Sequence, residues 1–305
     1  MERRLALRPL IALVIFGILS AARASAQVTF LGDWSDFGTQ FQLDGPHTRR
    51  MNGQPVEWVG GSGANHWRMV QEKGMDRLQM EQDPTSPKGG AVLRVQVLSG
   101  DNVGWTGERA EVSHMLGSDG KGIGVTPDTG HEVYGVAVKV DPYWQPPAHS
   151  WHWGLALQLH SPDELESPPA FALAVEQDFH INTCAGDIVD GVAAHGKSLP
   201  LTRGGLVPGH WVQFLIDVVW ANDSTGSLIV YRRDEGEATF TQVLKQTGQA
   251  TLQFRSTTPN PNAKHYWKMG YYRSVSPGVT SRLWLGPLAR GSSLQEVAIA
   301  AFGRP

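Results

Sequence analysis

Among its 305 residues the sequence contains a single cysteine, Cys184. An intramolecular disulfide is therefore excluded, so the fold must be stabilised by its core. Hydrophobic residues make up 41% of the chain, which is enough for a large core. A lone cysteine is more often a small buried hydrophobic residue than a nucleophile, and we expect Cys184 to be buried.

The sequence also has few charged residues and no large excess of either sign. Charged residues account for only 18% of the chain, and the formal net charge is −3. Without an overall basic surface, nucleic acid is not an expected partner. Beyond the N-terminus no apolar run is long enough to cross a bilayer. Amphipathic helical patterns are also missing, apart from one or two helical turns expected within residues 293–301.

The N-terminus has the three parts of a secretory signal peptide. They are a cationic start, an apolar run and a small-x-small cleavage motif: Arg3, Arg4 and Arg8, residues 10–19, and residues 24–26. The alternative, a membrane anchor, is weakened by the shortness of the apolar run. The sequence predicts a signal peptide over residues 1–26 and one domain over residues 27–305, secreted or periplasmic and monomeric.

Glycine, proline and tryptophan are abundant, with 35, 19 and 11 copies, as is typical of short strands joined by turns. Period-two alternation predicts these strands: a pair within residues 66–80, then residues 91–98, 107–114, 132–140, 151–160, 171–175, 211–220, 227–232, 265–273 and 281–287. The pattern indicates an all-β sandwich of two antiparallel sheets. One curved sheet of such a sandwich forms a concave groove that can hold an extended polymer.

The strand at residues 265–273 has one polar and one apolar face, because side chains alternate along a strand. The polar set is Tyr266, Lys268, Gly270 and Tyr272, and the apolar set is Trp267, Met269 and Tyr271. Gly270 would let another chain approach closely. A lysine between phenols favours a site for an anionic ring-shaped ligand, and an ordinary solvent-exposed strand face is the alternative.

Two other strands carry comparable polar sets. Arg109 and Glu111 share one face of their strand, opposite Ala110 and Val112. Gln158 and His160 share a face of theirs, and the opposite face carries these residues: Leu155, Leu157 and Leu159. We expect the three strands to be neighbours in one sheet. The alternatives are a plain Arg109–Glu111 salt bridge and an ordinary histidine at a strand end.

These residue types together suit β-elimination on a uronic-acid polysaccharide. Arg109, Gln158 and Lys268 can neutralise the uronate carboxylate and stabilise the enolate-like intermediate. His160 is a candidate general base. Tyr272 can protonate the leaving O4 or serve as the base itself, and the residues alone leave this choice open. The scheme requires no cofactor.

Three segments resemble the motifs of the jelly-roll polysaccharide lyases: residues 108–112, 158–160 and 266–273. The similarity is greatest to the heparin-lyase-I-like group, which includes the glucuronan lyases, and alginate lyases of the same fold have similar motifs. The resemblance implies a jelly-roll fold and a catalytic pair, His160 and Tyr272. It also implies that Arg109 and Lys268 line the same site. From the strand faces, Glu111 and Tyr266 are expected to lie in the same groove. The sequence lacks a strongly basic groove, which favours glucuronan or alginate over heparin.

Two other segments contain weaker candidates for metal ligands. His149 and His152 have the spacing of a metal pair but would face opposite sides of a strand, and an acidic loop could bind a structural calcium ion: Asp163, Glu164 and Glu166.

A glycoside hydrolase is one competing interpretation, which needs paired carboxylates such as Glu111 with Glu132 or Glu176. A carbohydrate-binding protein without catalytic activity is the other.

Overall fold

The structure is a computed structural model. The residues it describes are 27–34, 56–57, 66–74, 76–102, 107–117, 121–147, 153–161, 165, 167–189, 192–193, 196–201, 203, 205–257 and 264–305. The predicted signal peptide lies outside these ranges.

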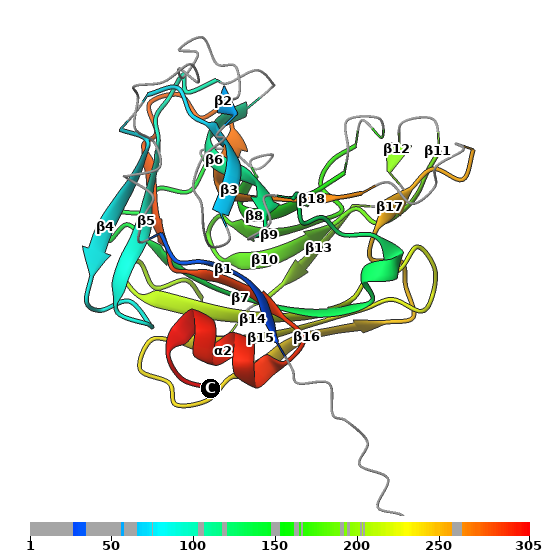
Figure 1. Ribbon diagram of the computed structural model, residues 1–305. Helices are drawn as coiled ribbons and strands as arrows, with labels where there is room; N and C mark the ends of the chain where they lie inside the picture. The colour runs from blue at the N-terminus through cyan, green and yellow to red at the C-terminus, as the bar shows by residue number, and fades with distance from the viewer. Residues whose placement is uncertain are drawn as a thin grey trace, which may run out of the picture.

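Two large antiparallel sheets pack face to face (Figure 1). Within the described residues the first sheet, here the support sheet, has nine strands. In spatial order they are β16 (Thr241–Thr247), β15 (Ser227–Asp234), β14 (Trp211–Val219), β7 (His131–Val140), β19 (Ser281–Leu285), β5 (Gly90–Val97) and β4 (Leu78–Asp83), with β20 (Leu288–Gly291) paired to β7 and β1 (Val28–Gly32) paired to β20.

The second sheet, here the site sheet, has eight strands in the described part of the chain. Their order is β13 (Lys197–Pro200), β10 (Phe179–Thr183), β9 (Phe171–Val175), β8 (Gly154–His160), β18 (Tyr266–Ser274), β6 (Gly107–Leu116), β3 (His66–Gln71) and β2 (Val56–Glu57). In Figure 1, β2 and β3 rise beside the middle strands, which makes the face turned away from the support sheet concave. A smaller sheet contains β12 (Val192–Ala193), β11 (Gly186–Val189) and β17 (Gln253–Phe254).

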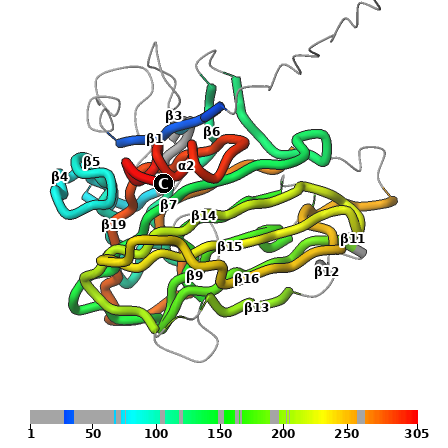
Figure 2. The backbone as a smooth tube through the Cα atoms, turned by 90° about the horizontal axis from the view of Figure 1, so that it is seen from below, coloured from blue at the N-terminus to red at the C-terminus, as the bar shows by residue number. Residues whose placement is uncertain are grey.

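Alternate side chains along the strands fill the core between the two sheets, and β7 is an example. Its inward residues belong to the main core cluster: Tyr134, Val136, Val138 and Val140. Val133 and Ala137 face the other way and pack with Val297 and Phe302 of α2 (Leu294–Phe302). Figure 2, seen from below, shows α2 against this outer face of the support sheet. The predicted all-β sandwich is confirmed, and so is the short helix at the tail.

Helix α2 has signals at both ends. Ser293 accepts a hydrogen bond from the backbone N–H of Glu296, and Gly303 ends the helix in the left-handed conformation at φ 73°. No helix among the described residues is long and apolar enough to cross a membrane.

The predicted strand pair within residues 66–80 is wrong. Both strands exist, but β3 pairs with β2 and β6 in the site sheet, whereas β4 pairs with β5 in the support sheet. Trp67 and Leu78 both enter the main core, from opposite sheets. The segment between them is therefore a crossing from sheet to sheet, which buries both apolar side chains in one core.

The predicted faces of β8 need one correction. Leu155 and Leu157 lie opposite Ala174 and Leu173, which are neighbours in β9, so β8 has one extra residue there and its alternation is interrupted. Leu157 and Leu159 lie in the core as expected, but Ala156 joins them there. Leu155 lies instead in a cluster that contains Tyr272.

Candidate active site

The three strands with polar faces are neighbours, in the order β8, β18, β6. Lys268 lies opposite Gln158 on one side and Ser113 on the other. Tyr266 lies opposite His160, and Tyr272 lies opposite Arg109. The alternating residues Val112, Leu159, Trp267 and Met269 are in the core. The structure thus brings all seven predicted residues to one face of the site sheet, here called the site face.

The middle of the site face is a buried polar cluster. Gln158 donates a side-chain hydrogen bond to Glu111, and the Arg109 Nη1 atom lies 3.7 Å from the Glu111 Oε2 atom. The exposed fractions are 2% for Arg109, 1% for Glu111, 1% for Gln158 and 6% for Lys268. The Arg109–Glu111 salt bridge considered from sequence is therefore present. Shielding from water strengthens the interaction of these charges with any ligand that reaches them.

Three atoms of this cluster are buried without a hydrogen-bond partner in the described structure: Arg109 Nε, Glu111 Oε2 and Gln158 Oε1. Such atoms are rare in native proteins, because each one has lost its hydrogen bonds to water. One is a donor and two are acceptors, so the cluster can bind a ligand that carries both hydroxyl groups and an anionic group.

One end of the site face is built around Tyr272. The Arg109 guanidinium carbon lies 3.6 Å from the centroid of the Tyr272 ring, and the Trp153 ring meets Tyr272 edge-on at 4.4 Å. Leu155 packs in the same cluster. A guanidinium on a phenol face is a cation–π contact, which orders both side chains.

The other end is built around Tyr266. Its ring centroid lies 5.4 Å from that of His160 and 3.9 Å from that of His114. The Lys268 Nζ atom lies 5.7 Å from the same ring. His114 was not among the predicted site residues. Strict alternation along its strand would place it with the core residues, and the sequence contains no other signal for it.

The hydrogen bond of His160 defines its tautomer. The Nδ1 atom lies 2.7 Å from the carbonyl oxygen of Ser161. A carbonyl only accepts, so Nδ1 carries the hydrogen, and in the neutral ring Nε2 carries the lone pair. His160 thereby presents the form of imidazole that a general base needs.

Gly270 allows the strands of the site to lie this close. A Cβ atom at this position would be 2.2 Å from the Ala110 carbonyl oxygen of β6, and its φ of 151° is outside the usual range for other residues. The close approach predicted at Gly270 is confirmed. The approaching chain is the neighbouring strand itself.

The site face is elongated along β18. Tyr272 is six positions after Tyr266 along β18, with a bulge between them. At about 3.3 Å per residue the two ends are roughly 17–20 Å apart along the backbone. Lys268 and Gln158 occupy the space between, so the arrangement suits an extended ligand better than a compact one.

Glu111 and Glu132, one carboxylate pair of the hydrolase alternative, are not brought together. Glu111 is in the site sheet, whereas Glu132 is on β7 of the support sheet, where it pairs with Arg290 at 2.6 Å. Glu176 follows β9, and burial raises its pKa. The residues of the possible metal sites are outside the described residues: His149, His152, Asp163, Glu164 and Glu166. Within the described residues no group of three metal-binding side chains occurs.

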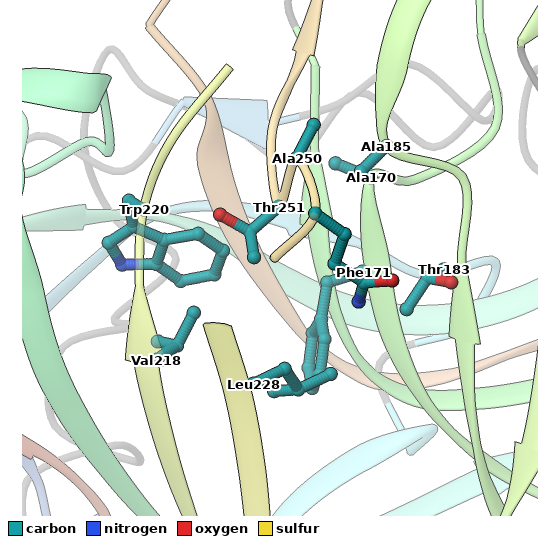
Figure 3. Close-up of a pocket in the computed structure, with 10 residues that line it drawn as sticks. Ala170, Phe171, Thr183, Ala185, Val218, Trp220, Leu228, Ala250 and Thr251 are labelled. Atoms are coloured by element: carbon teal, nitrogen blue, oxygen red, sulfur yellow. The ribbon is translucent and has the colours of Figure 1, made fainter. Parts of the chain in front are cut away.

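A recess lies elsewhere, between the two sheets (Figure 3). Its lining includes Phe171, Val218, Trp220 and Leu228 and contains none of the site-face residues. Cys184 is buried as predicted, and burial raises its thiol pKa, so it is a poor nucleophile.

Comparison with known proteins identifies a family and a similar fold. A family model described as polysaccharide lyase matches residues 61–286. No curated protein matches the chain. An endo-β-1,4-glucuronan lyase from the fungus Trichoderma reesei is similar in structure, with 14% sequence identity and a TM-score of 0.55 over 76% of this chain and 93% of that chain. An alginate lyase from Aplysia kurodai has 12% identity and a TM-score of 0.48, over 88% of this chain and 100% of the other. At such identity the similarity to the glucuronan lyase concerns the fold alone.

Proposed function

The chain belongs to the polysaccharide lyase family, and we propose that it cleaves a uronic-acid-containing polysaccharide by β-elimination. The observation that carries the proposal is the adjacency of β8, β18 and β6, which gathers cations, an amide, an imidazole and two phenols on one face. A concave sheet face with polar groups along one strand suits an extended polymer.

Arg109, Gln158 and Lys268 bind the uronate carboxylate in this proposal. Removing the C5 proton places a second negative charge next to the carboxylate, so the intermediate is a dianion. Buried donors that are already in place stabilise that charge without reorganising. Arg109 and Glu111 already form a pair, so the positive charge of Lys268 is the larger net contribution.

His160 and Tyr272 transfer the protons. The base takes the C5 proton, and the electrons of the C5–H bond form the double bond between C4 and C5. The C4–O4 bond breaks, and O4 leaves with the bonding electrons and receives a proton from the acid. The products are a new non-reducing end with an unsaturated uronate and a chain that carries the O4 hydroxyl group.

The stereochemistry of the substrate decides which group is the base. When the C5 proton and O4 are on opposite faces of the sugar, His160 removes the proton and Tyr272 protonates O4. When they are on the same face, Tyr272 serves both steps. The tautomer set by Ser161 favours His160 as the base, because its Nε2 atom carries the lone pair.

The charge of the site face favours a polymer without sulfate. Among the described residues, the cations of its central part are Arg109 and Lys268, and Glu111 offsets one of them. Glucuronan and alginate are therefore better candidates than heparin. The glucuronan lyase named above makes glucuronan the first polymer to test.

We also propose that the enzyme acts outside the cytoplasm as a monomer, after loss of residues 1–26. The chemistry of the N-terminus supports export, and a polymer substrate is encountered there. The mechanism uses side chains alone and requires no added cofactor.

The test uses the chain from Gln27 on glucuronan, alginate, hyaluronan, heparan sulfate and heparin. The assay follows the ultraviolet absorbance of the unsaturated uronate product. It compares the wild type with His160→Ala and Tyr272→Phe. We expect a signal on a non-sulfated uronan and a loss of roughly 10²–10⁴ in kcat in each variant. New reducing ends without this absorbance would establish hydrolysis and refute elimination. Binding without any cleavage would indicate a carbohydrate-binding protein.

A further inference from the structure

His114 occupies an unusual position in β6. Its φ is 60°, in the left-handed region that residues other than glycine seldom adopt. On one side of it Val112 is in the core, and on the other Met115 is in the core. Two residues, Ser113 and His114, therefore separate these core residues where regular alternation allows one.

The left-handed conformation brings the imidazole onto the site face. The His114 and Tyr266 rings are stacked, with centroids 3.9 Å apart and planes 11° apart. The His114 Nδ1 atom is 3.1 Å from the Ser113 hydroxyl, which restrains the ring in its own plane. Backbone strain of this kind persists where surrounding contacts require it and clusters at functional sites.

Tyr266 links this imidazole to the proposed base. It contacts His114 at 3.9 Å and His160 at 5.4 Å, and the planes of Tyr266 and His160 differ by 30°. All three rings are half-buried, and they come from β6, β18 and β8 respectively. Contact with the Tyr266 ring restrains rotation of the His160 ring about its χ2 angle. A displaced Tyr266 ring would therefore release His160 from the orientation in which its Nδ1 atom bonds the Ser161 carbonyl oxygen.

We propose that His114 is a positioning residue for the elimination, which holds the Tyr266 ring and through it the His160 imidazole. This inference rests on the proposed function, in which His160 transfers a proton. In this role the aromatic ring of His114, and not its ring nitrogens, is what the reaction requires.

The test compares two substitutions at His114. Asparagine adopts the left-handed conformation readily but has no ring, whereas phenylalanine keeps a ring without nitrogen. We expect His114→Asn to lower kcat roughly 10-fold to 100-fold with KM changed by no more than about twofold, because a small misplacement of a catalytic group is costly. His114→Phe should recover most of the loss. An equal loss in both variants would overturn the positioning role, and so would wild-type kcat in His114→Asn.

A double-mutant cycle adds a test that does not depend on the backbone at His114. Tyr266→Leu removes the linking ring at a regular strand position. If His114 acts through Tyr266, adding His114→Asn to Tyr266→Leu lowers kcat no further, whereas independent roles would multiply the two losses. His131→Asn, at a surface ion pair in the support sheet, is the control and should retain wild-type kcat.

Nitrogen-15 spectra of the imidazoles test the stack without any substrate. The wild type should show His160 as the Nδ1–H tautomer, and His114→Asn should show a mixture of tautomers. An unchanged His160 tautomer in His114→Asn would overturn the inference even where activity falls. A wild type that yields no unsaturated product on any uronan would refute the proposed function, and the spectra would still decide whether His114 positions His160.

Discussion

On the site face a single side chain can contact a ligand and also hold its neighbours in place, and Arg109 is the clearest case. Its guanidinium contacts the Tyr272 ring at 3.6 Å and a Glu111 oxygen at 3.7 Å. A planar guanidinium can stack on a ring while it donates hydrogen bonds in its plane. The residue proposed to bind the substrate therefore also holds the phenol proposed to be catalytic.

Arg109→Lys should consequently fail although it preserves the charge. A lysine ammonium cannot stack on Tyr272 and cannot bind a carboxylate through two parallel hydrogen bonds. We expect kcat/KM to fall roughly 10²-fold, in line with the loss of one preorganised donor. Initial rates from the unsaturated product measure this. A rate within about threefold of wild type would contradict the stacking argument.

Gly270→Ala tests the close contact of β6 and β18. The added Cβ would meet the Ala110 carbonyl oxygen at 2.2 Å, so the strands must separate. We expect the free energy of unfolding to fall by about 2–4 kcal/mol, with a loss of activity. Urea denaturation measures it. Gly122→Ala is the matched control, because nothing lies within 4 Å of its Cβ position, and similar losses in both variants would refute the steric explanation.

Among the elements, strands β6 and β18 are joined by a buried ion pair at the end that carries Arg109 and Tyr272. Glu108 and Arg273 form an ion pair at 2.9 Å, and both side chains are fully buried. Glu108 also accepts hydrogen bonds from the backbone N–H groups of Gly100 and Ser276. The pair joins two strands of the site to the loops beyond them.

Glu108→Gln leaves the Arg273 cation buried without its counter-charge. Breaking a buried pair in this way costs about 3–5 kcal/mol, and we expect that loss in the free energy of unfolding. Glu237→Gln, which breaks the part-exposed pair with Arg203, should cost at most about 1 kcal/mol. Equal effects of the two substitutions on the urea midpoint would show that the buried pair has no special role.

At the scale of the whole molecule, one core cluster contains residues of both large sheets, such as Trp267 and Leu285. We therefore expect the chain from Gln27 to unfold in a single cooperative transition. Tryptophan fluorescence and far-ultraviolet circular dichroism should give coincident urea curves. Two separate transitions would contradict the single domain predicted over residues 27–305.

The stability of the whole molecule should also depend on pH through His180. Burial lowers the pKa of His180 in the folded state, although Asp178 acts in the opposite direction. In the unfolded chain the group binds a proton below about pH 6.5, so the free energy of unfolding should decrease as pH falls through that value. His180→Gln should flatten this dependence below about pH 6.5 in urea titrations. A slope unchanged by the substitution would contradict the assignment.

Local alternation was sufficient to predict much of the fold. Residues such as Val112, Leu159 and Trp267 alternate with polar neighbours, and a strand can bury only one of its faces. The sandwich, the inward face of β7 and the polar faces of three strands follow from that rule. The motifs at residues 108–112, 158–160 and 266–273 likewise pointed to the polysaccharide lyases.

Tertiary structure alone decided which residues touch. The crossing between Trp67 and Leu78 depends on a core that forms from strands far apart in the chain. An extra residue in β8 opposite β9 moved Leu155 to the site face, because pairing register is a property of two strands together. His114 reached Tyr266 through a left-handed backbone angle, which residue type and spacing do not encode for histidine. The sequence by itself therefore determined the class of enzyme and the chemistry available to it, and the packing of neighbouring strands determined how those groups are paired.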